Sequence, residues 1–215
     1  MTTHTAAASK DAPERRTGSA LRDTRRRETA RNIERIALNL FATDGFDAVT
    51  VERIADAAHI SARTFFRYFP SKEDVLFENN RRAAELLRDA FSERPASESA
   101  DVALRNAIVD VCKHRGPQAT EAMQRVKVLA ETQMLASRGV GYDLEAASLL
   151  VPLYAERDGL DPEHDIGPQV RVASALAATA VAHHVWLSSG GELDLADLVV
   201  RALEVAGFGR QGDGA

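Results

Sequence analysis

Residues 50–77, TVERIADAAHISARTFFRYFPSKEDVLF, constrain the fold more than any other stretch of this 215-residue chain. Apolar residues recur there at helical spacing, and Thr50, Ser61 and Ser71 each stand where a helix N-cap is expected. Pro70 ends the second helix, because the residue before a proline is biased away from helical backbone. The stretch therefore predicts two short helices joined by a tight turn, followed by a third, longer helix that begins at Ser71.

An amphipathic helix precedes this stretch. Its apolar residues form one stripe at the helical period: Ile33, Ile36, Ala37, Leu40 and Phe41. Gly45 is placed to take the left-handed conformation that often ends a helix. Upstream, residues 1–23 are rich in Ala, Thr, Ser and charge without any period, so we expect them to form a disordered basic arm.

The charge of the chain is divided between its two parts. Residues 1–72 hold 13 Lys/Arg against 9 Asp/Glu, whereas residues 73–215 hold 14 against 23. A basic N-terminal third on an acidic remainder indicates nucleic-acid contacts confined to one domain. Cys112 is the only cysteine, so no intramolecular disulfide can form, which suits a reducing, cytoplasmic location. No apolar run is long enough to span a bilayer, and the N-terminus lacks a secretory signal.

Beyond Arg94-Pro95 the sequence predicts helices only, and hence an all-α protein. The expected spans are about 99–115, 117–137, 141–157, 166–188 and 192–206, and Pro152 should kink or break its helix. The predicted organisation is a disordered arm (1–23), a three-helix DNA-binding domain (24–72), a connecting helix (73–94), a ligand-binding and dimerisation domain (95–207) and a flexible tail (208–215).

Two short helices with this spacing form a helix-turn-helix, which places its second helix in a DNA major groove. The motif resembles that of the TetR family of bacterial transcriptional regulators, over about a third of the chain. The residues that match the family pattern are Thr50, Ile54, Ala55, Ala58, Ile60, Ser61, Thr64, Phe65, Phe66, Phe69 and Lys72. The resemblance implies a homodimer that binds a double-stranded, pseudo-palindromic operator and is released from it by a small-molecule effector.

One residue departs from the family pattern. Position 66 is usually a tyrosine whose hydroxyl reaches a phosphate, and Phe66 cannot make that bond. Arg63 is the best candidate for a bidentate contact to guanine, since it lies in the first turn of the recognition helix. The complete set of predicted DNA-binding residues is Thr50, Ala62, Arg63, Thr64, Phe66, Arg67, Tyr68 and Lys72, with Arg25, Arg26 and Arg27 of the arm in the minor groove or along phosphates. The arm residues could instead belong to a solvated tail.

The run Arg63 to Phe69, and a C-terminal stretch around Trp186, look like an actinobacterial subset of the family. That subset includes mycofactocin-associated regulators and others with acyl-CoA-like ligands. The resemblance implies an effector pocket lined by large or adaptable side chains. The candidates are His114, Met123, Val126, Val128, Met134, Tyr142, Tyr154, His183 and Trp186, each of which could equally be ordinary core. The effector would be acyl-CoA-like, or a flat lipophilic compound as in the family at large.

The helices 166–188 and 192–206 are the predicted dimer interface. The first carries alanines at 173, 175, 177, 178, 180 and 182, and the second an apolar stripe of Leu195, Leu198, Val199, Ala202, Leu203 and Ala206. Two such helices from each protomer would form a four-helix bundle.

The sequence also bears on three alternatives to an effector-released repressor. An activator of the same family is possible, and scattered His and Asp residues leave open a metal-sensing regulator. Catalysis is disfavoured, because no zinc-protease motif, phosphate-binding glycine loop or nucleophile elbow is present. We therefore expect a regulator with no catalytic residues, no cofactor and no metal site.

Overall fold

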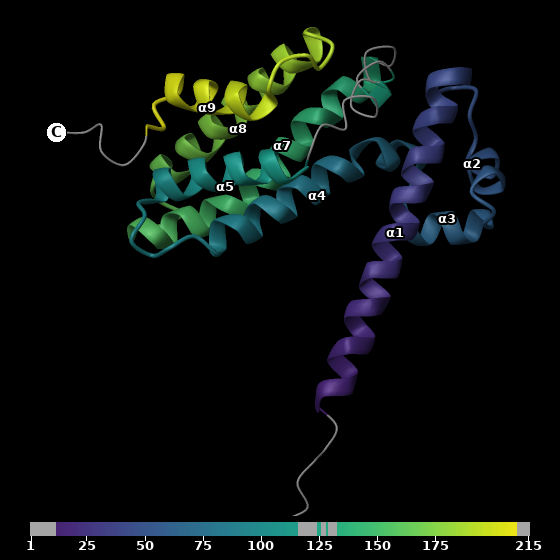
Figure 1. Cartoon of the computed structure of the whole chain (residues 1–215), viewed down its shortest axis with the longest axis horizontal. Helices are drawn as coiled ribbons and strands as arrows, with labels where there is room; N and C mark the ends of the chain where they lie inside the picture. Colours follow the sequence, from purple (N-terminus) through teal and green to yellow (C-terminus); the bar gives the residue numbers. More distant parts are fainter. Residues whose placement is uncertain (1–11, 116–123, 126–127, 129–132, 210–215) are drawn as a thin grey trace, which may run out of the picture.

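The structure, a computed structural model, describes residues 12–115, 124–125, 128 and 133–209. Every regular element in these ranges is a helix, so the predicted all-α fold is confirmed. In chain order the helices are α1 (Ala12–Asp44), α2 (Val51–Ala57), α3 (Ala62–Tyr68), α4 (Lys72–Ser92), α5 (Ala100–Arg115), α7 (Gln133–Asp158), α8 (Ile166–Ser188) and α9 (Leu195–Val205). Figure 1 shows α1–α3 at one side, which we call the headpiece, and α5, α7, α8 and α9 at the other, which we call the body.

The short helices of the headpiece begin where the sequence predicts. The side chains of Thr50, Ser61 and Ser71 each accept a hydrogen bond from the backbone N–H three residues on, at 3.2, 3.1 and 3.3 Å. Gly45 has a φ of +84° and ends α1, as expected. His59 has a φ of 54° in the turn between α2 and α3, a conformation that costs energy for any residue with a Cβ atom. These local signals fix the boundaries of α2, α3 and α4.

The headpiece core is built around aromatic rings. The fully buried rings of Phe41, Phe65 and Phe69 come from α1, from α3 and from the residue that follows α3, and Phe46 packs against Phe41 with ring centroids 4.9 Å apart. Aliphatic side chains from α1 and α2 fill the space between them. The core therefore joins all three helices and leaves the opposite face of α3 at the surface.

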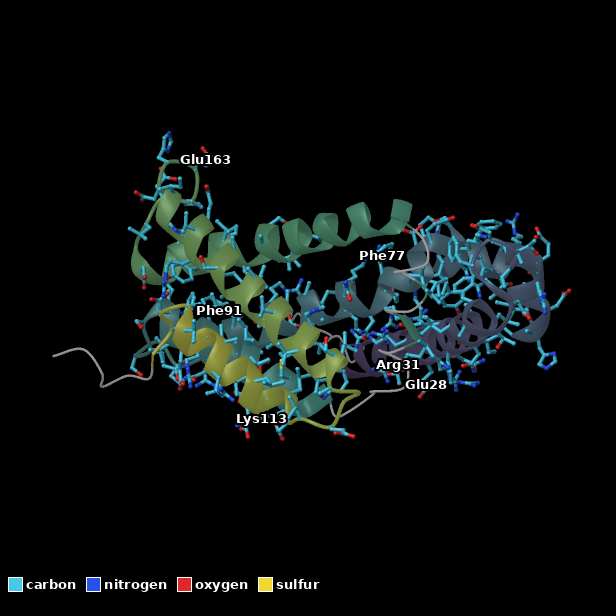
Figure 2. All side chains as sticks on the ribbon, turned by 90° about the horizontal axis from the view of Figure 1, so that it is seen from above. Glu28, Arg31, Phe77, Phe91, Lys113 and Glu163 are labelled. Carbon is cyan, nitrogen blue, oxygen red and sulfur yellow. The ribbon has the colours of Figure 1, made fainter. Side chains whose placement is uncertain are left out.

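Helix α4 belongs to both halves of the molecule. Val75, Leu76 and Phe77 at its start are buried in the headpiece core, whereas Leu87 and Phe91 near its end are buried in the body core. Figure 2 shows Phe77 and Phe91 at the two separate ends of this helix. A continuous helix therefore links the two cores.

The body is braced at the end remote from the headpiece by a hydrogen-bonded group on Asp101. Its carboxylate accepts two bonds from Arg171, at 2.9 and 2.6 Å, and one from the Tyr154 hydroxyl at 2.6 Å. Arg171 also donates to Gly207 O and lies over the ring of Phe208, 3.9 Å from its centroid. These contacts tie α5, α7, α8 and the chain after α9 together.

Four sequence predictions differ from the structure. Residues 12–23, expected in a disordered arm, belong to α1, because Ala, Arg, Glu and Leu extend a helix that is already nucleated. The break expected near residues 138–140 is absent, since α7 runs unbroken from Gln133. Pro152 lies inside α7, so the predicted break is wrong, while the kink stays a prediction. Phe208, expected in a flexible tail, is fully buried against the body. The predicted helix 117–137 lies mostly outside the described residues.

Candidate DNA-binding surface and effector domain

Helix α3 presents a charged and aromatic face to solvent. Arg63, Phe66 and Arg67 are exposed, while Ala62 and Thr64 in the first turn are half-buried. The Thr64 hydroxyl lies 2.9 Å from that of Ser61, so part of its hydrogen-bonding capacity is used within the cap. Among the first-turn residues, the guanidinium of Arg63 is the group best placed to reach a base edge.

Phe66 is 52% exposed, which is unusual for a phenylalanine in a well-packed headpiece. Its ring meets that of Phe65 edge-on, with centroids 5.6 Å apart, so the buried ring supports the exposed one. An exposed aromatic face can pack against sugar or a thymine methyl but cannot donate to a phosphate. The residue fits an apolar contact with DNA.

Tyr68 lies where α3 meets α1. The Arg67 guanidinium is 5.2 Å from its ring centroid, and Arg67 Nη2 is 3.5 Å from its hydroxyl. Burial on its own raises the pKa of the Tyr68 phenol, but hydrogen bonds with Arg67 and Thr29 and the charge of Arg26 outweigh it and lower the pKa. Tyr68 therefore joins the recognition helix to the basic part of α1.

The predicted arm residues Arg25, Arg26 and Arg27 are exposed on α1. In Figure 1 the N-terminal half of α1 projects beyond α2 and α3 and away from the body. Because these arginines stand on a helix, which is too wide for the narrow minor groove of B-DNA, contacts along the phosphate backbone fit the geometry better.

Lys72 has a role that the sequence did not indicate. Its ammonium donates to Phe46 O at 2.9 Å and Val49 O at 3.0 Å, and lies 4.3 Å from the centroid of the Phe46 ring. Two of its three N–H groups therefore hold the loop between α1 and α2, and one remains for a phosphate. Thr50, which caps α2, is exposed beside this loop.

A buried ionic group at the junction of headpiece and body was also missed. Glu34 on α1 is 5% exposed, and its carboxylate accepts from Arg82 of α4 at 2.6 Å and from Arg125 at 2.5 Å. The burial of Glu34 could have been recognised from Leu38, which lies one turn later on the same face of α1 and is fully buried. A carboxylate on a buried helix face requires cationic partners.

The predicted effector-pocket residues fall into three groups. Tyr154 and Trp186 are buried and His183 is half-buried, within the body. Val128 is buried in the headpiece core instead. Met123 and Val126 lie outside the described residues, as do the side chains of His114, Met134 and Tyr142. The Tyr154 hydroxyl donates to Asp101. Burial is the larger cause, and this hydrogen bond the second, that raises the pKa of the Tyr154 phenol well above the ordinary value. Tyr154 is therefore a bracing residue of the body.

The two helices of the predicted dimer interface differ in how much apolar surface they expose. The stripe expected on α9 is turned inward, with Val199 and Leu203 fully buried. Helix α8 has one face buried and another exposed, and the exposed face includes Ile166 at 72%, Val170 at 51% and Val181 at 60%. Among the described residues, α8 is the one helix that meets a length-and-hydropathy test for crossing a membrane, a test that core and interface helices also pass. In the same ranges, no group of three His, Cys, Asp or Glu could hold a metal ion.

Comparisons with known families agree with this two-part arrangement. Residues 35–78 match the family described as bacterial regulatory proteins, tetR family, and residues 98–210 match the family described as the MftR C-terminal domain. The first match covers α2 and α3, and the second covers the body.

Three known proteins illustrate the similarity. The transcriptional regulator TcmR of Streptomyces glaucescens is 30% identical over 195 residues, which are 88% of this chain and 84% of that protein. The putative mycofactocin biosynthesis regulator MftR of Mycobacterium tuberculosis is 26% identical, over 86% of this chain and 92% of that protein. Among solved structures, the repressor FadR of Thermus thermophilus in complex with lauroyl-CoA has a TM-score of 0.56 and 22% identity, over 86% of this chain and 98% of its own.

Proposed function

Since this chain belongs to the TetR family and is a transcriptional regulator, not an enzyme, we propose that it is a dimeric repressor released from its operator by a small effector. The exposed face of α3 carries the proposal, because Arg63, Phe66 and Arg67 are exposed on a helix whose other face is buried in the core. Residues 24–72 form the DNA-binding unit in this proposal, and residues 95–207 the effector-binding and dimerisation unit.

The DNA contacts divide by role. Arg63 reads a guanine, and Phe66 makes an apolar contact. Arg67, Tyr68, Thr50 and the free N–H of Lys72 contact phosphates, which position the headpiece without reading sequence. Ala62 and Thr64 line the same turn. Arg25, Arg26 and Arg27 extend the basic surface along α1, and their contribution is electrostatic.

The test of DNA recognition is selection of binding sites from random duplexes, followed by gel shifts with variants. We expect a pseudo-palindromic site, in which Arg63→Ala costs about 1–3 kcal/mol of discrimination at one base pair of each half-site. Arg26→Ala should weaken all duplexes alike and reduce the slope of log affinity against log salt. Failure of the wild-type protein to select any site would contradict the proposal.

The exposed apolar face of α8 supports the dimer. This face carries Ile166, Val170 and Val181 at helical spacing. A contiguous apolar surface exposed to water is typical of a protein–protein interface. We place the two-fold axis against α8, where α8 of one protomer packs on α8 of its partner. Val170→Glu should convert the dimer to a monomer in analytical ultracentrifugation, whereas Val205→Glu, at a 90% exposed residue of α9, serves as a control for a charge elsewhere.

The effector belongs to the lipophilic or acyl-CoA-like class. The match to the MftR C-terminal domain and the fold shared with the lauroyl-CoA-bound repressor support this assignment. Mass spectrometry of molecules that co-purify with the protein would identify the class directly. In gel shifts with the selected operator, saturating acyl-CoA of increasing chain length should release the DNA, and an unchanged affinity at every length would contradict the assignment. We expect the regulator to act in the cytoplasm, where DNA and acyl-CoA are both present.

A further inference from the structure

Residues between α5 and α7 contact the headpiece, which is a second connection besides α4. Gln124 Nε2 donates to Asn39 Oδ1 on α1 at 3.3 Å, Arg125 donates to Glu34, and Val128 is buried within the headpiece core. We call Glu34, Arg82, Gln124, Arg125 and Val128 the junction cluster. Its members come from α1, from α4 and from a part of the chain that follows α5, so it fixes the headpiece against two elements at once.

Glu34 is the centre of the junction cluster. Its Oε2 accepts from Arg82 and its Oε1 from Arg125, so each carboxylate oxygen holds a different element. Both Glu34 and Arg125 are more than nine-tenths buried. Neutralising the carboxylate would remove a charged acceptor from Arg82 and from the buried Arg125 together, which disfavours this packing. The carboxylate of Glu34 is therefore the one group of the junction cluster that ties α1 to both of the other elements.

We propose that Glu34 is a positioning residue for DNA recognition, which sets the angle of each headpiece on the body and thereby the separation of the two recognition helices. The inference rests on the proposed function, dimeric operator binding. In such a dimer the two helices enter successive major grooves about 34 Å apart. One additional base pair moves a half-site by about 3.4 Å and turns it by about a tenth of a turn. A fixed headpiece discriminates against that change, and a loosened one tolerates it.

The experiment compares duplexes that carry the same two selected half-sites at the selected spacing, or with one base pair added or removed. The wild-type protein should prefer the selected spacing. In Glu34→Gln, which keeps the shape of the side chain, this preference should fall by about tenfold, within the usual range for coupling between sites. Base preference within a half-site should be unchanged, since α3 and its exposed residues are untouched.

A double-mutant comparison separates this role from general destabilisation. Arg125→Met should lose spacing preference to a similar extent, and the double variant should lose no more than the larger single effect, because both remove the same contact. Glu98→Gln is the matched control: Glu98 accepts from Arg94 and Asn106 in the body, away from the junction cluster. It should keep the wild-type preference. Circular dichroism reports whether each variant folds. If Glu34→Gln does not fold, the comparison of spacings is made with Arg125→Met.

The outcomes are distinct. If the wild-type protein binds all three spacings equally, dimeric operator recognition itself is contradicted, and the inference with it. If the wild-type protein has a clear optimum that folded Glu34→Gln and Arg125→Met retain, the positioning role is wrong and the proposed function stands. A loss of base preference within the half-site would also overturn the inference, because it would place the effect in α3.

Discussion

The headpiece and the body are held together by different kinds of contact. Five buried phenylalanines dominate the headpiece core, whereas the body core has two, with five buried alanines among its members. The body is braced at its remote end by charged groups such as Asp101 with Arg171. A core of a few large rings tolerates substitution poorly, while a core of many small side chains can repack. The headpiece is thus built to keep one shape, and the body to accommodate change.

The largest expected effect comes from opening the headpiece core. Phe65→Ala should cost about 3–5 kcal/mol, because the ring is fully buried in the headpiece core. Hydrogen exchange should show lost protection in α2 and α3, with α8 and α9 unchanged. The matched body variant is Leu104→Ala, also fully buried, which should spare the headpiece. Equal loss of protection throughout the chain in both variants would mean that the two regions unfold as one unit.

A smaller effect should follow from removing the ammonium of Lys72. Lys72→Met keeps an apolar side chain of similar length but removes the ammonium that donates to Phe46 O and Val49 O, at a cost of about 1–3 kcal/mol in urea unfolding. DNA affinity should fall mainly because the headpiece is less stable. Unchanged stability together with a reduced salt dependence of DNA binding would contradict the structural role of Lys72 and leave only its proposed phosphate contact.

In the body, Asp101→Asn tests the hydrogen-bonded group that Asp101 forms with Arg171 and Tyr154. The change should cost about 1–2 kcal/mol in urea unfolding, reduced from the value for a buried pair because the Asp101 side chain is 38% exposed and screened. Exchange protection should fall in α8 and after α9, with DNA binding retained. Asp110→Asn, at another partly exposed acid that accepts from an arginine, should have a smaller effect. A loss of operator binding would show that the brace reaches the headpiece.

The smallest effect is a gain in stability. His59→Gly should stabilise the headpiece by under about 1 kcal/mol, since glycine adopts the positive φ of this turn without the Cβ penalty, partly offset by a more flexible unfolded chain. Thermal unfolding with and without the substitution provides the measurement. Ala58→Gly, at the neighbouring residue with a φ of −86°, should bring no gain. A loss of stability in His59→Gly would indicate that the imidazole makes a favourable contact.

The sequence predicted the headpiece closely because its signals are local. Ser61 and Gly45 act within a few residues, through a cap and a left-handed turn, and the structure confirms both. The roles of Lys72 and Glu34 depend on partners 23 to 91 residues away, so spacing could not reveal them. The α9 stripe was identified as apolar, but periodicity does not tell which surface covers it. In the sequence, a stripe that is buried against its own chain, as Val199 is, has the same pattern as a stripe that packs against a partner protomer.

Helix α4 sets a scale for the coupling of the two regions. Its 21 residues span about 30 Å, with buried side chains at one end in the headpiece and at the other in the body. Treated as a rigid lever, a rotation of about 6° at the body end displaces the headpiece end by about 3 Å, close to the rise of one base pair. A change in the body no larger than the repacking of one or two side chains is therefore enough to move a recognition helix out of register with its groove.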